Sequence, residues 1–462
     1  MTNLPIEINN IYKKFESNNK KNKEELGEVF TPFNIVDNML TKIPCNILIK
    51  ENTRWLDTSV GMGHIMVKVY YLIYGHLKFN EKFNDKKQLS KHIIENMLFM
   101  TEINKENCDK TREIFKMIDP DSTPNIIECN FLENNNLGDF DIIVMNPPYN
   151  SGGTKCNGQK NLYVYFAEKA MNLLKKDGYY LAIHPSTYRI NNYKPRGTKI
   201  DINELYNKNN IMDITMFTVW QTYQLMDVQI NTDIILIQKN KEYHETMVRN
   251  IYGEISCIKI NKNNIIPNFG FIIIDKLKKI ADRVGSLRDM IYHTSEIHHE
   301  AWKKGKIKNG KYKIIHLLKK KENKIYYSDK KHTHQNTPKI IINGLGNKYV
   351  FLDREGEYGV TDSPYIILSS SEKIYKLLSS KIFLYVCNAL GILGNNLKPF
   401  IFDYLPNTDI LWKHKENINN NDESIFKTFG LNAKEINNIM SFSNNNVQNL
   451  KLKDRKDIFN NI

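Results

Sequence analysis

The chain has 462 residues, of which 41% are hydrophobic, so it can bury a sizeable core and is expected to form two or three domains. Its net charge of +14 favours a polyanionic partner, above all nucleic acid, although an Asn-, Lys- and Ile-rich composition accounts for part of that charge. The start is polar, no apolar run reaches transmembrane length, and the six cysteines form no Cys-x-x-Cys pair. These features argue against a signal peptide, a membrane span, a zinc cluster and a disulfide scaffold, and they predict a cytoplasmic protein.

Residues 1–26 are polar and charged and are interpreted as an N-terminal arm with one short helix at 6–15. The arm either is a solvated tail or contacts a nucleic-acid backbone. Residues 27–32, GEVFTP, then open a helix, with Thr31 as a plausible N-cap and Pro32 at the first helical position.

A glycine-containing loop follows the first predicted strand, which ends at Asp57. The pattern is Asp57-Thr-Ser59-Val-Gly61-Met-Gly63, and an apolar helix comes directly after it. Glycine allows close approach of a ligand to the backbone, and a helix N-terminus attracts a carboxylate. A lone GxG is weak evidence, so this loop is only a candidate ligand site.

The next two predicted strands also end in polar residues. Residues 98–103 end with Glu102-Ile103, and in nucleotide-binding sites an acid at this position binds ribose hydroxyls. The strand at 126–129 ends at Asn130-Phe131. Because carboxyl ends of parallel strands share one sheet edge, these residues are expected near the glycine loop.

The fourth strand, 140–145, ends in Asn146-Pro147-Pro148-Tyr149 and is the most informative stretch of the chain. Asn146 and Pro147 each precede a proline, which favours extended geometry. The Asn146 amide oxygen and the Pro147 carbonyl then offer two adjacent acceptors for an amino group, and Tyr149 can stack on the flat molecule that carries it. A plain strand exit is the alternative explanation.

Strands and helices alternate to about residue 195, which predicts a mostly parallel sheet wrapped by helices. A helix at 163–174 and strands at 179–183, 211–217 and 230–238 complete this part. The last two strands, with little helix between them, predict an antiparallel edge strand. The expected fold is therefore α/β, with a Rossmann-like seven-stranded sheet.

Residues 27–240 resemble class I S-adenosylmethionine-dependent amino-methyltransferases of DNA, in the gamma-class motif order and of the Eco57I-like restriction–modification type. The resemblance rests on the residues 27–32, the glycine loop, Glu102 and the Asn-Pro-Pro-Tyr motif. It implies methyl transfer from S-adenosylmethionine to N6 of a flipped adenine in double-stranded DNA, by a cytoplasmic enzyme of bacterial or viral origin.

The resemblance also implies residue roles. Asn146, Pro147, Pro148 and Tyr149 match the catalytic motif. Cofactor contacts are implied for Thr31, Pro32, Asp57, Ser59, Gly61, Gly63, Glu102, Ile103, Asn130, Phe131 and Asn146. Asn130 stands where the family usually has an aspartate that contacts the adenine of the cofactor; an asparagine can still accept from that amino group.

From residue 241 the alternation is lost, and residues 241–414 are interpreted as a C-terminal α+β target-recognition domain, with 415–462 as a linker and helical tail. Residues 303–339 are basic and interleaved with tyrosines, which suits a phosphate backbone and unstacked bases. Lys319, Lys320 and Lys321 are candidate DNA contacts; a solvated loop is the alternative. Two aromatic residues, Trp220 and Tyr223, precede the last strand of the sheet. Either could stack on the second face of the flipped base, or both could pack in the core.

Other functions stay open. Related enzymes with the same motif methylate RNA bases or the side-chain amide of a protein glutamine. Cytosine N4 is a further candidate acceptor. A non-catalytic nucleic-acid-binding subunit with the same fold is the third alternative. The pairs His298-His299 and His332-x-His334 have no Cys or carboxylate at ligand spacing, so no metal is expected. No nuclease pattern is found, so we expect no cleavage activity, while a separate restriction endonuclease remains a possible partner.

Overall fold

The computed structural model describes residues 4–17, 30–83, 85–150, 161–195, 197–239, 245–261, 263–298, 310–320, 323, 325–414, 421–443 and 447–457. The chain divides into two compact units. Unit 1 comprises Met1–Ile265 together with Asn449–Ile462, and unit 2 comprises Ile266–Gln448. Each unit is described by itself.

Unit 1 is built on one nine-stranded sheet in the order β3-β2-β1-β4-β5-β7-β6-β8-β9. Neighbours from β3 to β5 are parallel, and β7 runs antiparallel to both β5 and β6. The strands are β1 (Trp55–Asp57), β2 (Leu98–Glu102), β3 (Asn125–Glu128), β4 (Phe140–Met145), β5 (Leu174–Pro185), β6 (Asn210–Phe217), β7 (Thr232–Gln238), β8 (Thr246–Arg249) and β9 (Ile255–Ile258).

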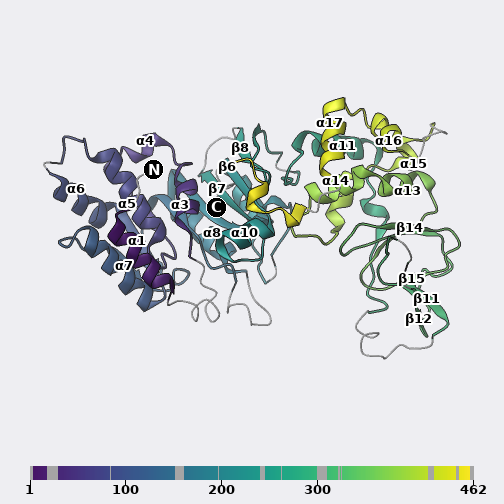
Figure 1. Ribbon diagram of the computed structural model, residues 1–462, viewed down its shortest axis with the longest axis horizontal. Helices are drawn as coiled ribbons and strands as arrows, with labels where there is room; N and C mark the ends of the chain where they lie inside the picture. Colours follow the sequence, from purple (N-terminus) through teal and green to yellow (C-terminus); the bar gives the residue numbers. More distant parts are fainter. Residues whose placement is uncertain are drawn as a thin grey trace. The chain divides into compact units, whose positions relative to one another are not determined.

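Helices cover both faces of this sheet (Figure 1). They are α1 (Ile6–Ser17), α3 (Phe33–Leu40), α4 (Cys45–Leu48), α5 (His64–Leu77), α6 (Lys86–His92), η1 (Ile93–Met97), α7 (Lys105–Ile118), α8 (Leu162–Leu173), η2 (Ser186–Arg189), α9 (Ile202–Asn207) and α10 (Val219–Met226). Alternate strand residues such as Ile142 and Val144 share one apolar core with α1, α3 and α5. Their neighbours Ile143 and Met145 are equally buried on the other face. Burial of both faces explains the continuous apolar run of β4.

The expected fold class is confirmed, with one addition. The seven predicted strands are present, and β7 is antiparallel to both of its neighbours. It is not the predicted edge strand, however, because it lies between β5 and β6, and β8 and β9 extend the sheet beyond β6. Both are short, and β9 has exposed residues at alternate positions, so neither carries the apolar signal of a buried strand. Unit 1 therefore continues to residue 265, beyond the predicted boundary at residue 240.

The end of the chain returns to unit 1 instead of forming only a helical tail. Arg455 is 2% exposed and stacks on Phe217 with its guanidinium carbon 4.8 Å from the ring centre. Its Nη1 donates to the Met216 carbonyl at 2.7 Å and to Gln221 Oε1 at 3.2 Å. Asp457 accepts from the other guanidinium nitrogens at 3.0 and 2.6 Å. The tail is thereby fixed to the end of β6 and the start of α10.

We expect Arg455→Ala to lower the free energy of unfolding of unit 1 by about 2–3 kcal/mol, because Asp457, Gln221 and the Met216 carbonyl would all lose a buried partner. Chemical denaturation followed by circular dichroism measures this change. The control is Lys453→Ala, which removes an exposed cation from the same tail. Equal stabilities of the two variants would contradict a structural role for Arg455.

Unit 2 combines helices with two small sheets, ordered β10-β16-β13-β14 and β12-β11-β15. The helices gather at one end of the unit and β11, β12 and β15 lie at the other (Figure 1). The strands are β10 (Ile291–Tyr292), β11 (Tyr312–Ile315), β12 (Ile325–Ser328), β13 (Lys339–Ile342), β14 (Val350–Asp353), β15 (Gly359–Val360) and β16 (Tyr365–Ile367). The helices are α11 (Phe271–Val284), η3 (Arg288–Met290), α13 (Glu372–Ser379), α14 (Lys381–Ala389), η4 (Pro399–Tyr404), α15 (Thr408–Leu411), α16 (Asp422–Thr428) and α17 (Ala433–Phe442); η5 (Val447–Asn449) leads back to unit 1, where η6 (Leu452–Asp454) follows.

The apolar segment 371–390 of unit 2 forms two helices. Ser380 is extended (φ −85°, ψ 165°) and separates α13 from α14. Serine competes with helical hydrogen bonds through its hydroxyl, and here Ser380 Oγ donates to the Leu377 carbonyl at 2.6 Å. Across the described ranges, no helix is both long and apolar enough to cross a membrane.

Candidate active site

The candidate site lies at the carboxyl ends of β1, β2 and β4. Strand β1 is central, with β2 on one side and β4 on the other, both parallel to it. The chain runs from β1 to β2 and β3 in one direction and then crosses to β4 in the other, so the strand order reverses between β1 and β4. Such a switch point is where open α/β sheets bind ligands. Asp57 and Asn146 both lie there.

Asn146 is held from two sides by residues of the predicted cofactor motifs. Its Nδ2 donates to Thr31 Oγ1 at 3.0 Å, and its main-chain carbonyl accepts from Ser59 Oγ at 3.3 Å. Thr31 is 4% exposed, so its hydroxyl is a fixed acceptor. Because Nδ2 is engaged by Thr31, the amide oxygen is directed away from Thr31. The structure therefore joins three sequence motifs that lie as much as 115 residues apart.

The rest of the motif is largely enclosed. Pro147 is buried, and Pro148 and Tyr149 are half-buried. Tyr149 packs edge-on against Tyr163 of α8 at a centroid distance of 6.5 Å. Burial raises the pKa of the Tyr149 phenol, whose oxygen has no hydrogen-bond partner among the described residues. Tyr149 thus presents a neutral ring to the site.

The glycine loop needs both of its glycines. Gly61 and Gly63 have φ of +54° and +84°, a region that L-residues rarely adopt. A Cβ on Gly63 would lie 3.1 Å from Thr111 Cγ2 of α7. The Gly61 amide donates to Glu102 Oε2 at 2.8 Å, and the Asn104 amide donates to Glu102 Oε1 at 2.9 Å. Glu102 therefore fixes the position of the glycine loop. Each of its carboxylate oxygens still has a lone pair that can accept a hydrogen bond from a ligand.

Asp57 is the most perturbed carboxyl of the site. It is 1% exposed; Oδ1 accepts from the Ser59 amide at 3.1 Å, while Oδ2 has no partner among the described residues. Burial, with a smaller contribution from the nearby Glu102 carboxylate, raises the pKa of Asp57 to about 7. The ionised form is thus poorly stabilised by the protein alone, and a cationic group beside Oδ2 would stabilise it.

The remaining predicted cofactor residues lie at the ends of β2 and β3. The Ile103 side chain is 70% exposed. Asn130 closes a local turn, since its Oδ1 accepts from the Leu132 amide at 3.1 Å and its Nδ2 donates to Glu133 at 2.7 Å. Phe131 is 2% exposed and packs on Phe166 of α8. The Asn130 side chain therefore already makes two hydrogen bonds within its own turn. Phe131 is mainly a core residue.

Sequence reasoning missed an aromatic group beside the glycine loop. The His64 ring, at the start of α5, lies 4.3 Å from the Tyr12 ring and 5.6 Å from the Phe30 ring. Tyr12 belongs to α1 and is 1% exposed. Part of the predicted N-terminal arm is thus packed against the loop. The apolar spacing within α1 predicts that one face of this helix is buried. It does not predict the partner, because His64 lies about 50 positions further along the chain.

The substrate candidates are distributed over both units. Trp220 and Tyr223 lie on α10, not in a loop, and pack edge to face at 5.6 Å. They are 42% and 37% exposed, which excludes a core role. Because β6 is parallel to β4, α10 follows the same sheet edge as Asn146, three strand spacings away, or about 14 Å. Lys319 and Lys320 are exposed in the β11–β12 connection of unit 2, and Lys321 lies outside the described residues.

The described residues hold no cluster of three or more His, Cys, Asp or Glu side chains able to bind a metal. His332 is fully buried, with its Nε2 3.9 Å from Glu296 Oε2, and burial lowers its pKa to about 4. His334 packs on Tyr292. These histidines are packing residues of unit 2, and His299 lies outside the described residues.

If Asn146 has the catalytic role that the resemblance implies, Thr31→Val should reduce the rate of methyl transfer about tenfold, since the amide loses the hydrogen bond that fixes its orientation. Thr31→Ser keeps the hydroxyl and should retain most of the wild-type rate. Single-turnover kinetics of both variants measures this difference. Equal impairment of the two variants would contradict this role of the Thr31 hydroxyl, because Thr31→Ser keeps the hydroxyl and Thr31→Val removes it.

Comparisons with known proteins find one family model and several solved structures that are similar to this chain. Residues 40–223 match the family model described as "Eco57I restriction-modification methylase". The solved type IIL restriction-modification enzyme MmeI in complex with DNA is 13% identical, with a TM-score of 0.48, covering 96% of this chain and 76% of that chain. The type IIG restriction endonuclease BpuSI is 12% identical, with a TM-score of 0.42 and coverages of 91% and 66%.

The M protein of the type I restriction enzyme EcoKI is 16% identical, with a TM-score of 0.38, and the match covers 48% of this chain and 47% of that chain. The chain thus spans about half of the EcoKI M protein. A comparison with curated proteins gave no match. The segment 40–223, which holds the glycine loop, Glu102 and the Asn-Pro-Pro-Tyr motif, is the part of the chain that matches the Eco57I restriction-modification methylase family model.

Proposed function

We propose that the protein is an S-adenosylmethionine-dependent DNA methyltransferase that modifies N6 of adenine. The observation that carries this proposal is the fixed Asn146 amide at the β1/β4 switch point, oriented by Thr31 and Ser59. Residues 27–240 would form the catalytic domain. Residues 241–414 would supply target recognition, except that 241–265 belong to the compact unit of the catalytic sheet.

The residues present fit the proposed cofactor. Asp57 Oδ2 is buried without a partner among the described residues, as expected of an acceptor that awaits a cationic amino group. Gly61 and Gly63 keep the loop backbone open, and a Cβ on Gly63 would press on Thr111. Glu102 is fixed by two amides and would take the ribose hydroxyls. Ile103 would cover one face of the adenine ring, and Asn130 would accept from its amino group through the free lone pair of Oδ1.

When bound, S-adenosylmethionine supplies an electrophilic methyl group. The chain's own contribution is to hold the acceptor nitrogen. Asn146 Oδ1 and the Pro147 carbonyl accept its two N–H hydrogens, which draws the nitrogen lone pair out of conjugation with the ring. Fixed dipoles of this kind act by positioning and electrostatic stabilisation, and no side chain must change protonation before the nitrogen reacts.

An adenine inside a duplex cannot reach this edge, so it must be flipped out of the stack, at a cost of a few kcal/mol. Tyr149 would stack on one face of the flipped base. Trp220 and Tyr223 lie about 14 Å along the edge, so they suit the flanking DNA better than the second face of the same base. Lys319 and Lys320 would bind phosphates. A separate restriction endonuclease is a candidate partner.

The test is transfer of labelled methyl from S-adenosylmethionine to unmethylated genomic DNA, with the modified base identified by mass spectrometry. The expected product is N6-methyladenine. Labelled N4-methylcytosine would keep the enzyme class and change the acceptor. Label found only on RNA or on protein glutamine would overturn the proposal, and so would absence of cofactor binding, which would indicate a non-catalytic subunit.

A further inference from the structure

The turn that follows β3 begins beside Glu102. It comprises residues 130–135, and its first residue is Asn130. In the register of the sheet, Glu128 at the end of β3 lies opposite Glu102. The Cys129 amide then donates to the Glu102 carbonyl at 2.8 Å, so the pairing continues up to the residue before Asn130. Asn130 therefore lies at the same carboxyl end of the sheet as Glu102.

The side-chain amide of Asn130 has a fixed orientation. Its Oδ1 accepts from the Leu132 amide at 3.1 Å, and its Nδ2 donates to Glu133 Oε1 at 2.7 Å. A flipped amide would place Nδ2 against the Leu132 N–H group and Oδ1 against the Glu133 carboxylate, so both hydrogen bonds would be lost. The second lone pair of Oδ1 is therefore an acceptor whose position is set by two neighbours.

Lys169 of α8 holds the other side of this turn. Its Nζ donates to the Leu132 carbonyl at 3.1 Å, to the Asn134 carbonyl at 2.7 Å and to Asn135 Oδ1 at 3.4 Å. An ammonium group has three N–H donors, and hydrogen bonds from a charged donor are stronger than neutral ones. The same ammonium lies 5.3 Å from the centre of the Phe131 ring. Lys169 thus uses its donors on one turn.

Helix α8 is a firm support for this contact. Its residues Tyr163, Phe166 and Ala170 are buried. Phe166 lies three positions before Lys169, on the same side of the helix, and its ring is 5.2 Å from the Phe131 ring. The turn is therefore held between the end of β3 and a helix that is itself fixed by the core.

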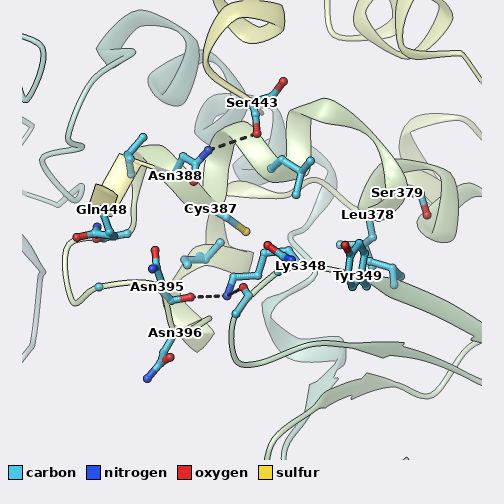
Figure 2. Close-up of a pocket in the computed structure, with 18 of the residues that line it drawn as sticks. Lys348, Tyr349, Leu378, Ser379, Cys387, Asn388, Asn395, Asn396, Ser443 and Gln448 are labelled. Carbon is cyan, nitrogen blue, oxygen red and sulfur yellow. Dashed lines mark hydrogen bonds between the residues drawn. The ribbon is translucent and has the colours of Figure 1, made fainter. Parts of the chain in front are cut away.

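Unit 2 shows the same use of an ammonium group at the wall of a cavity of about 490 Å³ (Figure 2). Lys348 Nζ donates to the Gly346 carbonyl at 3.0 Å and to the Asn395 carbonyl, which ties two loop segments together. Two of the three acceptors of Lys169 are likewise main-chain carbonyls. A lysine engaged in this way fixes a loop, so we expect Lys169 to act on a ligand only through the turn.

We propose that Glu133 and Lys169 are positioning residues that hold the Asn130 oxygen toward the amino group of the cofactor's adenine. Glu133 determines which end of the Asn130 amide faces the site, and Lys169 fixes the turn that carries it. An acceptor at this place favours a purine ring with an amino group and disfavours one with an oxygen there. The inference rests on the proposed function, because it requires S-adenosylmethionine in the site.

The test compares two ligands of the full chain by isothermal titration calorimetry. S-Adenosylhomocysteine carries the amino group, and S-inosylhomocysteine has an oxygen in its place. The wild type should bind the first roughly tenfold more tightly, because Asn130 Oδ1 would face a second acceptor in the other. Glu133→Ala and Lys169→Met should each reduce this ratio to about threefold or less, since the amide can then turn or shift. Damage elsewhere in the protein would weaken both ligands equally and leave the ratio unchanged.

The matched control is Lys176→Met, which removes an exposed lysine of β5 and should keep the wild-type ratio. Lys169→Arg keeps a cation with several N–H donors and should retain most of the preference. An unchanged ratio in Glu133→Ala or in Lys169→Met would overturn the role of that residue and leave the proposed function intact. Equal binding of the two ligands by the wild type would overturn the inference as a whole. A wild type that binds no S-adenosylhomocysteine would overturn the proposed function and this inference with it.

Discussion

Replacing Asn146 by alanine should lower kcat for methyl transfer by about 10³-fold, the loss seen when one preorganised hydrogen-bonding group is removed from the reacting centre. The variant keeps the Pro147 carbonyl but loses the side-chain acceptor that Thr31 orients at 3.0 Å. The acceptor amine would then stay conjugated with its ring and remain a poor nucleophile. Rapid-quench measurement of a single turnover separates this chemical step from DNA binding.

The cofactor should still bind to Asn146→Ala within about tenfold of wild type, because Asp57, Glu102 and the glycine loop are unchanged. Asn96→Ala is the matched control: Asn96 is exposed on η1 of the same unit and should retain full activity. If Asn146→Ala kept more than about a tenth of the wild-type kcat, the amide would not be the catalytic acceptor, and the proposed mechanism would fail.

Replacing Asp57 by asparagine should have two opposite effects, one on binding and one on stability. The pKa of Asp57 is raised to about 7 by burial, so the carboxylate forms only as the pH rises through about 7. Cofactor affinity of the wild type should therefore increase about tenfold between ~pH 6 and ~pH 8. The asparagine variant should bind roughly tenfold more weakly at ~pH 8 and show no such pH dependence. Isothermal titration calorimetry across this range measures both.

The stability effect has the opposite sign. The folded-state pKa of Asp57 lies above its ordinary value of 3.8, so the folded protein binds the extra proton between these two values. The contribution of Asp57 to stability is therefore largest below the lower value and falls as the pH rises towards 7. The ligand-free asparagine variant lacks this penalty and should be more stable than wild type at ~pH 8, by up to about 4 kcal/mol.

Asp139→Asn is the control for charge, since Asp139 is exposed in the same unit, and its stability should follow that of the wild type. A variant of Asp57 that is less stable than wild type at ~pH 8, or cofactor binding that stays flat between ~pH 6 and ~pH 8, would show that the Asp57 carboxylate is already satisfied within the protein.

The sequence by itself determined most of the sheet of unit 1 and its motifs, because these features are local. A buried apolar strand stopped by two prolines, and glycines at a strand-to-helix turn, each reflect constraints on a few neighbouring residues. That is why β1, β2 and β4, with Asp57, Glu102 and Asn146 at their ends, were predicted. The antiparallel direction of one late strand was also predicted, but its place at the sheet edge was wrong, because β7 lies between β5 and β6.

Only the tertiary structure decided which distant groups meet. Thr31 orients the Asn146 amide across 115 residues, Tyr12 packs on the glycine-loop helix, and Arg455 returns the chain end to β6 and α10. None of these contacts has a periodic signal, since each depends on how separate elements pack.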